Sequence, residues 1–298
     1  MLDLVIDSRR KDLGGGLEVG RVLPFAGHRM VGPFIFLDHM GPADFAPGEG
    51  VDVRPHPHIG LSTVTYLFEG EIHHRDNLGF SQPIRPGAVN WMTAGSGIVH
   101  SERTDPGLRA TGARMHGMQA WVALPEQDEE TAPGFVHYDS AELPEFSEGG
   151  VWARLIAGSA YGLGNEVKTH SPLFYLHTEL GAGARLALPE IHTERAAYIV
   201  SGSVEHEGTR YAAGRMLVFA PGGAPLLIAP DGPARVMLLG GEPIGQRFIW
   251  WNFVSSSRER IEQAKADWKA GRMRLPPEDS VEFIDLPDDP PPARPHTV

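Results

Sequence analysis

Apolar and polar residues alternate in short runs over the first 241 residues, a pattern typical of β-strands whose two faces meet different surroundings. The segment "STVTYLFEGEIHHRD" alternates β-branched and aromatic residues around a turn at Glu69-Gly70, and "GAVNWMTAG" and "MQAWVALP" are aromatic-rich runs bounded by Gly or Pro. The same pattern of short, strand-like runs bounded by Gly or Pro occurs again in "RAAYIVSGSVEHEG", "RMLVFAPGG" and "ARVMLLGGEP". Many short strands at this spacing predict an all-β sandwich or barrel.

The two halves of the chain also resemble each other. "TVTYLFEGEIHH" with a later "IRPGAVNWMTAG" is matched by "RAAYIVSGSVEH" with a later "YAAGRMLVFAPG". Two unrelated hairpins can look this similar, but the same order and spacing of two motifs favour a duplication. We therefore predict two β-barrels of similar design, residues 1–128 and 129–245, divided within "LPEQDEETAPGFVHY".

The chain after residue 245 has a helix-forming rather than a strand-forming composition. "SSSRERIEQAKADWKAGRM" has a Ser N-cap candidate, a helix-forming composition and a closing Gly271, so residues 246–275 are predicted to hold one helix. Its packing face is predicted to contain Ile261, Ala264, Lys265 and Trp268. The simplest role for this helix is to cap the second barrel. The Pro-rich tail, residues 276–298, is expected to be disordered or extended.

Composition excludes several classes of protein. With 38 acidic and 26 basic residues the formal charge is −12, which disfavours direct binding to nucleic acid or anionic lipid. The chain has no cysteine, which excludes disulfides and thiolate metal sites. We find no apolar run of membrane-spanning length and no secretion signal, and we expect a cytoplasmic monomer.

Candidate chemistry lies in two paired motifs. His56 and His58 are separated by one residue, so on a strand they point to the same side; His100 and Glu102 have the same spacing about forty residues on. Two such strands facing each other would present three imidazoles and one carboxylate to a common centre. This donor set suits a divalent metal such as Fe, Mn, Ni, Cu or Zn and leaves two open positions in an octahedral field.

Other polar residues have structural interpretations. His73 and His74 are adjacent and point to opposite faces of a strand, and "HRDNLG" is interpreted as a loop in which Arg75 and Asp76 bond the backbone and each other. Gln119 either lines the pocket or is a core amide bonded to backbone. Five apolar side chains are expected to line the barrel, some of them also touching a substrate: Phe34, Phe36, Phe68, Trp91 and Met92.

These motifs resemble the pirins, a branch of the cupin superfamily. "HPHIGLSTVTYLFEGEIHHRDNLG" followed by "IRPGAVNWMTAGSGIVHSE" carries the likeness, and "VGPFIFLDHMGPADF", "GMQAWVALP" and "GGEPIG" extend it over most of residues 1–245. The resemblance implies a bicupin of two stacked antiparallel, jelly-roll β-barrels with an iron-type metal in the first. Carried over position by position, it implies the ligands His56, His58, His100 and Glu102.

The second half departs from this pattern. Aligning the turn glycines of the two halves places non-ligand residues at most ligand positions, and the nearby His192 and Glu194 differ in register. We therefore expect a metal-free C-terminal barrel, as in other pirins. The four residues aligned with His56, His58, His100 and Glu102 are Leu188, Glu190, Leu227 and Ala229.

The family implies two classes of function. Some pirins resemble quercetinases, which cleave the central ring of a flavonol with release of carbon monoxide, so the first hypothesis is a dioxygenase that takes O2 and a small aromatic substrate. Its cofactor would be one divalent metal, Fe(II) first and Mn, Ni, Cu, Zn or Co as alternatives, with Glu102 as general base or as a plain ligand. The second hypothesis is a metal- and redox-dependent regulator that binds a protein partner, as a transcription cofactor or a modulator of a metabolic enzyme. A cupin isomerase or an inactive metal-stabilised fold is a weaker third.

Overall fold

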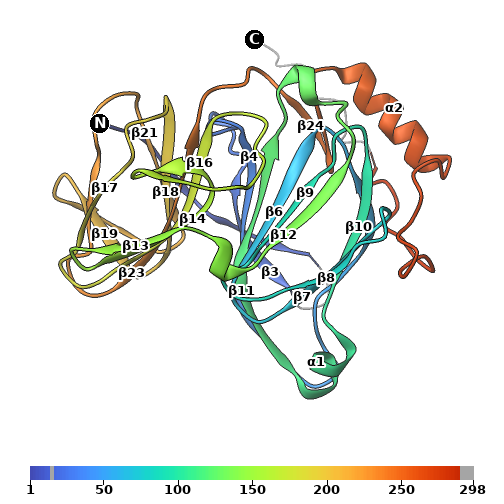
Figure 1. Cartoon of the computed structure of the whole chain (residues 1–298), viewed down its shortest axis with the longest axis horizontal. Helices are drawn as coiled ribbons and strands as arrows, with labels where there is room; N and C mark the ends of the chain where they lie inside the picture. The colour runs from blue at the N-terminus through green and yellow to red at the C-terminus, as the bar shows by residue number, and fades with distance from the viewer. Residues whose placement is uncertain (14–16, 289–298) are drawn as a thin grey trace, which may run out of the picture.

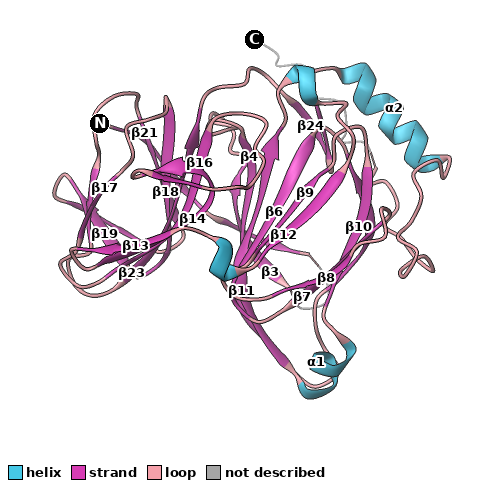
Figure 2. Cartoon of the chain, in the orientation of Figure 1, coloured by secondary structure: helices cyan, strands magenta, loops and turns pink. Residues whose placement is uncertain are grey.

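A computed structural model describes residues 1–13 and 17–288. Two β-barrels lie side by side, and the few helices lie at their periphery (Figures 1 and 2). All pairings between the named strands of the described residues are antiparallel. The predicted all-β bicupin architecture with one C-terminal helix is therefore confirmed. Residues 289–298 of the predicted tail lie outside the described residues.

The N-terminal barrel consists of two facing sheets. The larger sheet has seven strands, in the spatial order β12 (Gly134–Tyr138), β9 (Val89–Thr93), β6 (Leu61–Glu69), β11 (Ala113–Ala123), β4 (Phe34–Phe45), β3 (Glu18–Leu23) and β2 (Arg9–Asp12). The smaller sheet has four, in the order β5 (Asp52–His58), β10 (Ile98–Arg103), β7 (Ile72–Asp76) and β8 (Ser81–Ile84). Both predicted ligand pairs thus lie on adjacent strands of the smaller sheet.

The C-terminal barrel repeats this design. Its larger sheet has the order β1 (Leu2–Asp7), β21 (Arg215–Phe219), β18 (Glu194–Ser201), β23 (Ala234–Gly241), β16 (Leu173–Leu180), β14 (Val151–Ala160) and β13 (Glu145–Glu148), with β15 (Leu163–Gly164) beside β14. Its smaller sheet has the order β17 (Arg185–Ala187), β22 (Leu226–Ile228), β19 (Ser203–His206) and β20 (Thr209–Ala212).

Two strands cross the boundary that we predicted at residue 128. The first strand, β1, pairs with β21 of the C-terminal barrel, and Leu2 lies opposite Phe219. In the other direction β12 pairs with β9 of the N-terminal barrel, with Tyr138 opposite Val89. Each barrel is therefore completed by a strand from the other side of the boundary.

A shared apolar core joins the barrels. It contains buried residues from both larger sheets, among them Tyr66 and Met118 of the first barrel and Tyr175, Tyr198 and Met237 of the second. Burial of apolar surface contributes about 25 cal/mol per Å². The two barrels consequently form one packed unit rather than two independent modules.

The C-terminal segment packs on the first barrel, which corrects our expectation that its helix caps the second. The hairpin β24 (Phe248–Trp250) and β25 (Phe253–Ser255) leads into α2 (Arg258–Lys269), whose N-cap Ser257 accepts a hydrogen bond from Arg260 N. Its predicted face is confirmed, because Ile261, Ala264 and Trp268 are buried against Ile59, Val99 and Phe253, and Lys265 Nζ lies 4.5 Å from the Trp250 ring centroid.

Three shorter helical turns complete the described structure: α1 (Pro106–Thr111), η1 (Glu126–Asp128) and η2 (Ser140–Glu142). None was predicted, since a turn of three to six residues carries little periodic signal. Of the helices that the structure describes, none has the length and apolar character needed to cross a membrane.

Candidate metal centre

The first ligand pair sits on β5, an edge strand of the smaller sheet. An edge strand tolerates Pro55 and Pro57, which have no backbone N–H to donate to a neighbouring strand. β5 ends at His58, and Gly60, just beyond it, has a φ of +67°. A side chain there would collide with Val254 O, so only glycine allows this tight turn into β6. The "HPHIG" segment is therefore shaped to hold its two histidines at a fixed edge.

Three histidines converge across this edge. β10 lies antiparallel to β5, with His100 directly opposite His56. The ring centroids are 4.4 Å apart for His56 and His100, and 5.0 Å apart for each of the other two pairs with His58. One potential ligand atom from each ring lies within 4.8 Å of the other two. In the part of the chain that the structure describes, this is the one such group of three or more His, Asp or Glu side chains.

The ring nitrogens fit a cation. His56 Nδ1 donates to Arg54 O at 2.8 Å, which leaves Nε2 as the free nitrogen. Both ring nitrogens of His58 and Nε2 of His100 are buried, with no hydrogen-bond partner among the described residues. An unsatisfied buried polar atom costs about 1–3 kcal/mol, so a bound metal would remove a penalty that the empty cluster carries.

The electrostatics favour the metal-binding form of these rings. Burial lowers the pKa of His56 to about 4. Burial and the neighbouring imidazoles hold the pKa of His58 and of His100 well below the ordinary value. All three rings are therefore neutral near pH 7, which is the protonation state a metal requires.

Glu102 lies beside the three histidines but is not part of their group. A β-bulge between His100 and Glu102 places Glu102 opposite Val53 rather than Arg54. Its Oε1 accepts a hydrogen bond from Gln119 Nε2 at 3.5 Å and lies 3.3 Å from the Thr65 hydroxyl oxygen. Burial raises the pKa of this carboxyl, while His74 and the neighbouring Thr65 and Gln119 side chains oppose the rise. Its role as fourth ligand stays a prediction.

Sequence reasoning missed a contact behind the histidine cluster, in which His74 lies between His100 and Asp76. His74 Nδ1 lies 3.3 Å from His100 Nδ1, and His74 Nε2 lies 2.9 Å from Asp76 Oδ2. Asp76 also accepts from the backbone of Leu78, as predicted. The predicted pairing of Arg75 with Asp76 is wrong, because adjacent strand residues face opposite sides and Arg75 pairs instead with Glu278. The i, i+2 spacing of His74 and Asp76 was the available signal.

A cavity of about 630 Å³ opens over the histidines. His56, His58 and Glu102 are among its lining residues, and Phe36 and Trp121, which also line it, stack with ring centroids 4.0 Å apart. This volume lies within the range typical of small-molecule sites. Of the five residues predicted to line the barrel, only Phe36 borders this cavity. The other four lie in the hydrophobic cores or pack against them: Phe34, Phe68, Trp91 and Met92.

Two polar features interrupt the apolar wall. Gln119 lines the cavity and accepts a hydrogen bond from the Thr65 hydroxyl at 2.8 Å, so it is a pocket residue bonded to a side chain. Arg21 Nε and Nη2 donate to the two oxygens of the buried Asp38 at 2.9 and 2.8 Å. Sequence reasoning did not find Arg21 and Asp38, because each is unremarkable until β3 and β4 pair.

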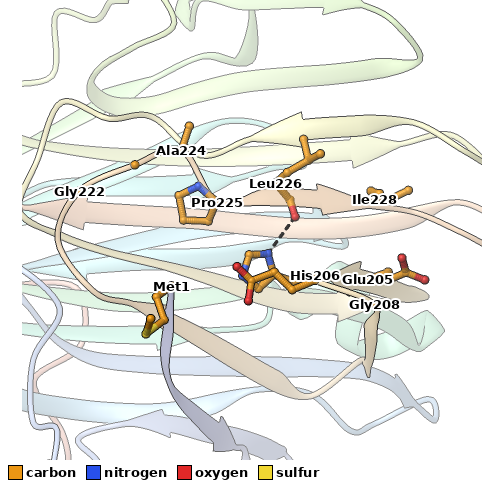
Figure 3. Close-up of a pocket in the computed structure, with 11 residues that line it drawn as sticks. Met1, Glu205, His206, Gly208, Gly222, Ala224, Pro225, Leu226 and Ile228 are labelled. Atoms are coloured by element: carbon orange, nitrogen blue, oxygen red, sulfur yellow. Dashed lines mark hydrogen bonds and ion pairs between the residues drawn. The ribbon is translucent and has the colours of Figure 1, made fainter.

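The second barrel is filled where the first is open. Leu188, Leu227 and Ala229 are buried in its apolar core, while Glu190 is exposed. Its surface carries a separate pocket of about 410 Å³ beside His206 (Figure 3). His206 Nδ1 donates to Leu226 O at 3.0 Å; its Nε2 is buried without a hydrogen-bond partner among the described residues and lies 3.8 Å from Glu207 Oε1. No group of three potential ligands forms at this pocket within the described residues.

Two antiparallel barrels, one with a three-histidine cluster under a cavity, define a bicupin. Family models named "Pirin" and "Pirin C-terminal cupin domain" match residues 16–122 and 175–274. A pirin-like protein of Caulobacter vibrioides is 62% identical over 97% of this chain and 100% of its own length. The chain belongs to the pirin family.

Solved structures agree with this assignment. A quercetin 2,3-dioxygenase from Acinetobacter baumannii aligns with a TM-score of 0.89 and 33% identity, covering 98% of this chain and 97% of that one. A bacterial pirin, YhhW from Escherichia coli, was solved in complex with nickel(II). It aligns with a TM-score of 0.63 and 19% identity over 80% of this chain and 99% of its own, and shows the shared fold.

Proposed function

We propose that this pirin is a metal-dependent dioxygenase that acts on a flavonol-type aromatic molecule, with Fe(II) held by His56, His58 and His100. The observation that carries the proposal is the convergence of three neutral imidazoles, with unpartnered nitrogens, beneath a cavity of about 630 Å³. Similarity at 33% identity to a protein titled quercetin 2,3-dioxygenase supports the choice of substrate class.

When bound, a divalent metal would act as a Lewis acid that lowers the pKa of a substrate hydroxyl and offers open positions to O2. The chain supplies the proton acceptor. The Glu102 carboxyl is buried and has a raised pKa, so it accepts a hydroxyl proton more readily than an exposed carboxylate would. Gln119 holds the acceptor in place, because its Nε2 donates to Glu102 Oε1 at 3.5 Å while its Oε1 accepts the proton of the Thr65 hydroxyl at 2.8 Å.

The cavity walls orient the substrate. The stacked Phe36 and Trp121 rings provide an apolar surface for a planar aromatic ring. The pair of Arg21 and Asp38, which also lines the cavity, offers both donors and an acceptor to ring hydroxyls. A hydroxylated aromatic bicycle matches this combination of flat apolar walls and one polar pair.

The test is oxygen consumption by the Fe(II)-loaded protein in the presence of quercetin. We expect uptake in the unchanged protein and a loss of about 100-fold or more in both Glu102→Ala and Glu102→Gln, because neither can accept the proton. Glu205→Ala removes a carboxylate from a strand of the second barrel and should retain the full rate. Metal content is measured in every sample.

If metal is bound but no oxygen is consumed, the dioxygenase proposal fails. The same result would favour the second hypothesis, a redox-dependent regulator, because that hypothesis needs the histidines but no turnover. Equal oxygen uptake by the unchanged protein and by Glu102→Gln would instead show that Glu102 does not act as the proton acceptor.

A further inference from the structure

The chain beyond α2 turns back across the first barrel and reaches its metal cavity. We call residues 278–286 the strap. Ile284 N donates to Pro55 O at 2.9 Å, and Trp268 Nε1 donates to Ile284 O at 3.0 Å. The edge of one ring meets the face of the other where Phe283 packs on Trp268, with centroids 5.4 Å apart. The strap thus lies between α2 and β5, the strand that carries His56.

Three arginines on three strands of the smaller sheet contact the strap. Arg103 on β10 donates to both oxygens of Asp279, at 2.6 and 3.0 Å, and to Glu282 Oε1 at 3.0 Å. Arg75 on β7 lies 3.6 Å from Glu278, and Arg54 on β5 lies 3.9 Å from Glu282. Because β5, β10 and β7 are neighbours in the sheet, these cations form one basic row that matches the acidic strap.

The basic row and the metal centre belong to the same strands. Along β10, Arg103 directly follows Glu102, and alternate strand residues face opposite sides of a sheet. The strap therefore docks on the back of the strand that presents His100 to the cavity. From there Ile284 reaches the cavity, which it lines together with His56 and His58.

The strap is held by contacts that can open. Val281 is 99% exposed, and Phe283 is also exposed. Among the described residues, the backbone of the strap bonds the barrel only through Ile284 N. The pairs of Arg54 with Glu282 and of Arg75 with Glu278 are long and partly exposed, and such surface ion pairs are individually weak and screened by salt; the bidentate pair of Arg103 with Asp279 is more buried and is the main electrostatic hold on the strap. Arg103 also pairs with Asp52 on β5 at 2.8 Å, so it keeps a partner when the strap leaves.

We propose that the strap is a gate over the metal cavity, closed by the basic row, and that Ile284 limits the size of the molecule that enters. The gate concerns access alone and holds whichever metal or reaction the site supports. It decides which aromatic substrates reach the histidines only if the proposed dioxygenase function also holds.

The absence of cysteine allows a direct test. Val53 lines the cavity, and Val53→Cys introduces a single thiol of similar size. The rate at which this thiol reacts with 4,4′-dithiodipyridine, a neutral aromatic disulfide, is followed by absorbance in the metal-free protein. Asp279→Lys with Glu282→Lys in this background should raise the rate about tenfold, the effect expected from losing several surface ion pairs.

Two controls make the result specific. Asp7→Lys breaks the exposed pair with Arg215 on the second barrel, 3.0 Å in length, and should leave the thiol rate unchanged. Raising the salt to about 1 M should speed labelling of the Val53→Cys protein and have little effect once the strap acids are replaced. Far-ultraviolet circular dichroism verifies that each variant is folded.

Equal labelling rates with and without the strap acids, together with no effect of salt, would overturn the gate. So would an equal acceleration by Asp7→Lys. Because labelling needs neither metal nor turnover, the gate can fail while oxygen uptake succeeds, and the reverse. In the salt experiment the strap keeps its own sequence, so the gate stays testable even if the double substitution unfolds the protein.

Discussion

The two barrels share one architecture and fill it in opposite ways. The first keeps three histidines and a carboxyl beneath a cavity, while the second places Leu188, Leu227 and Ala229 in a continuous apolar core. The comparison teaches that the same cupin barrel can hold either potential metal ligands or an apolar core at its inward positions. Its chemistry depends on a few inward positions, and the fold tolerates either content there.

The largest effect should come from removing a histidine of the cluster. We expect His56→Ala to abolish metal binding, a loss of at least about 100-fold in affinity, because two imidazoles cannot replace three. The matched control is His206→Ala. His206 is also buried and also donates from Nδ1 to a backbone carbonyl, but it has no cluster around it.

Metal content by elemental analysis, together with the melting temperature, decides the outcome. Metal retained by His56→Ala alongside a large fall in melting temperature would make the histidines a structural element of the core and remove the distinction between the barrels. Loss of metal from His206→Ala as well would move the binding site, or part of it, to the second barrel.

A smaller effect should separate the barrels in stability. Leu227 is fully buried in the second core, and Leu227→Ala should cost about 2–5 kcal/mol in the free energy of unfolding. At the position of the first barrel that the sequence aligns with Leu227, His100→Ala should cost the metal-free protein less than about 1 kcal/mol, since it removes an unsatisfied buried nitrogen. Urea unfolding of both metal-free variants measures the difference. Equal costs would mean that the metal-free cluster packs as tightly as an apolar core.

The smallest predicted effect concerns the seam between the barrels. His39 Nδ1 lies 2.9 Å from the Tyr198 hydroxyl across that seam, and His39 Nε2 lies 2.8 Å from His116 Nε2. Burial, reinforced by His116 and Arg235, lowers the pKa of His39 to about 4. In the unfolded chain its pKa is near 6.5, so between these values the unfolded chain binds more protons and stability falls with falling pH.

Replacing this residue should flatten that dependence. From pH 7 to pH 5, His39→Gln should lose about 1–2 kcal/mol less free energy of unfolding than the unchanged protein. Urea unfolding at several pH values gives both curves. Parallel curves would show that His39 titrates alike in the folded and unfolded chain, and the seam would then have no part in the acid response.

Local patterns predicted much of this molecule. The alternation of apolar and polar residues predicted the strands. The i, i+2 spacing of residues on β5 and β10 was enough to predict that His56, His58 and His100 lie together. The position of Glu102 was less predictable, because a single bulge changes its register and no residue type signals it. The strap could not be foreseen at all, since its docking row draws one arginine from each of three strands.

The pairing of β1 with β21 has a consequence for biosynthesis. Residues 2–7 leave the ribosome well before their partners at 215–219, which are made more than two hundred residues later. During that interval the segment has no sheet to join, while the strands of the N-terminal barrel can already pair with one another. A chain cut between the barrels would leave the downstream fragment short of an edge strand and the upstream fragment with a strand that has nothing to pair with.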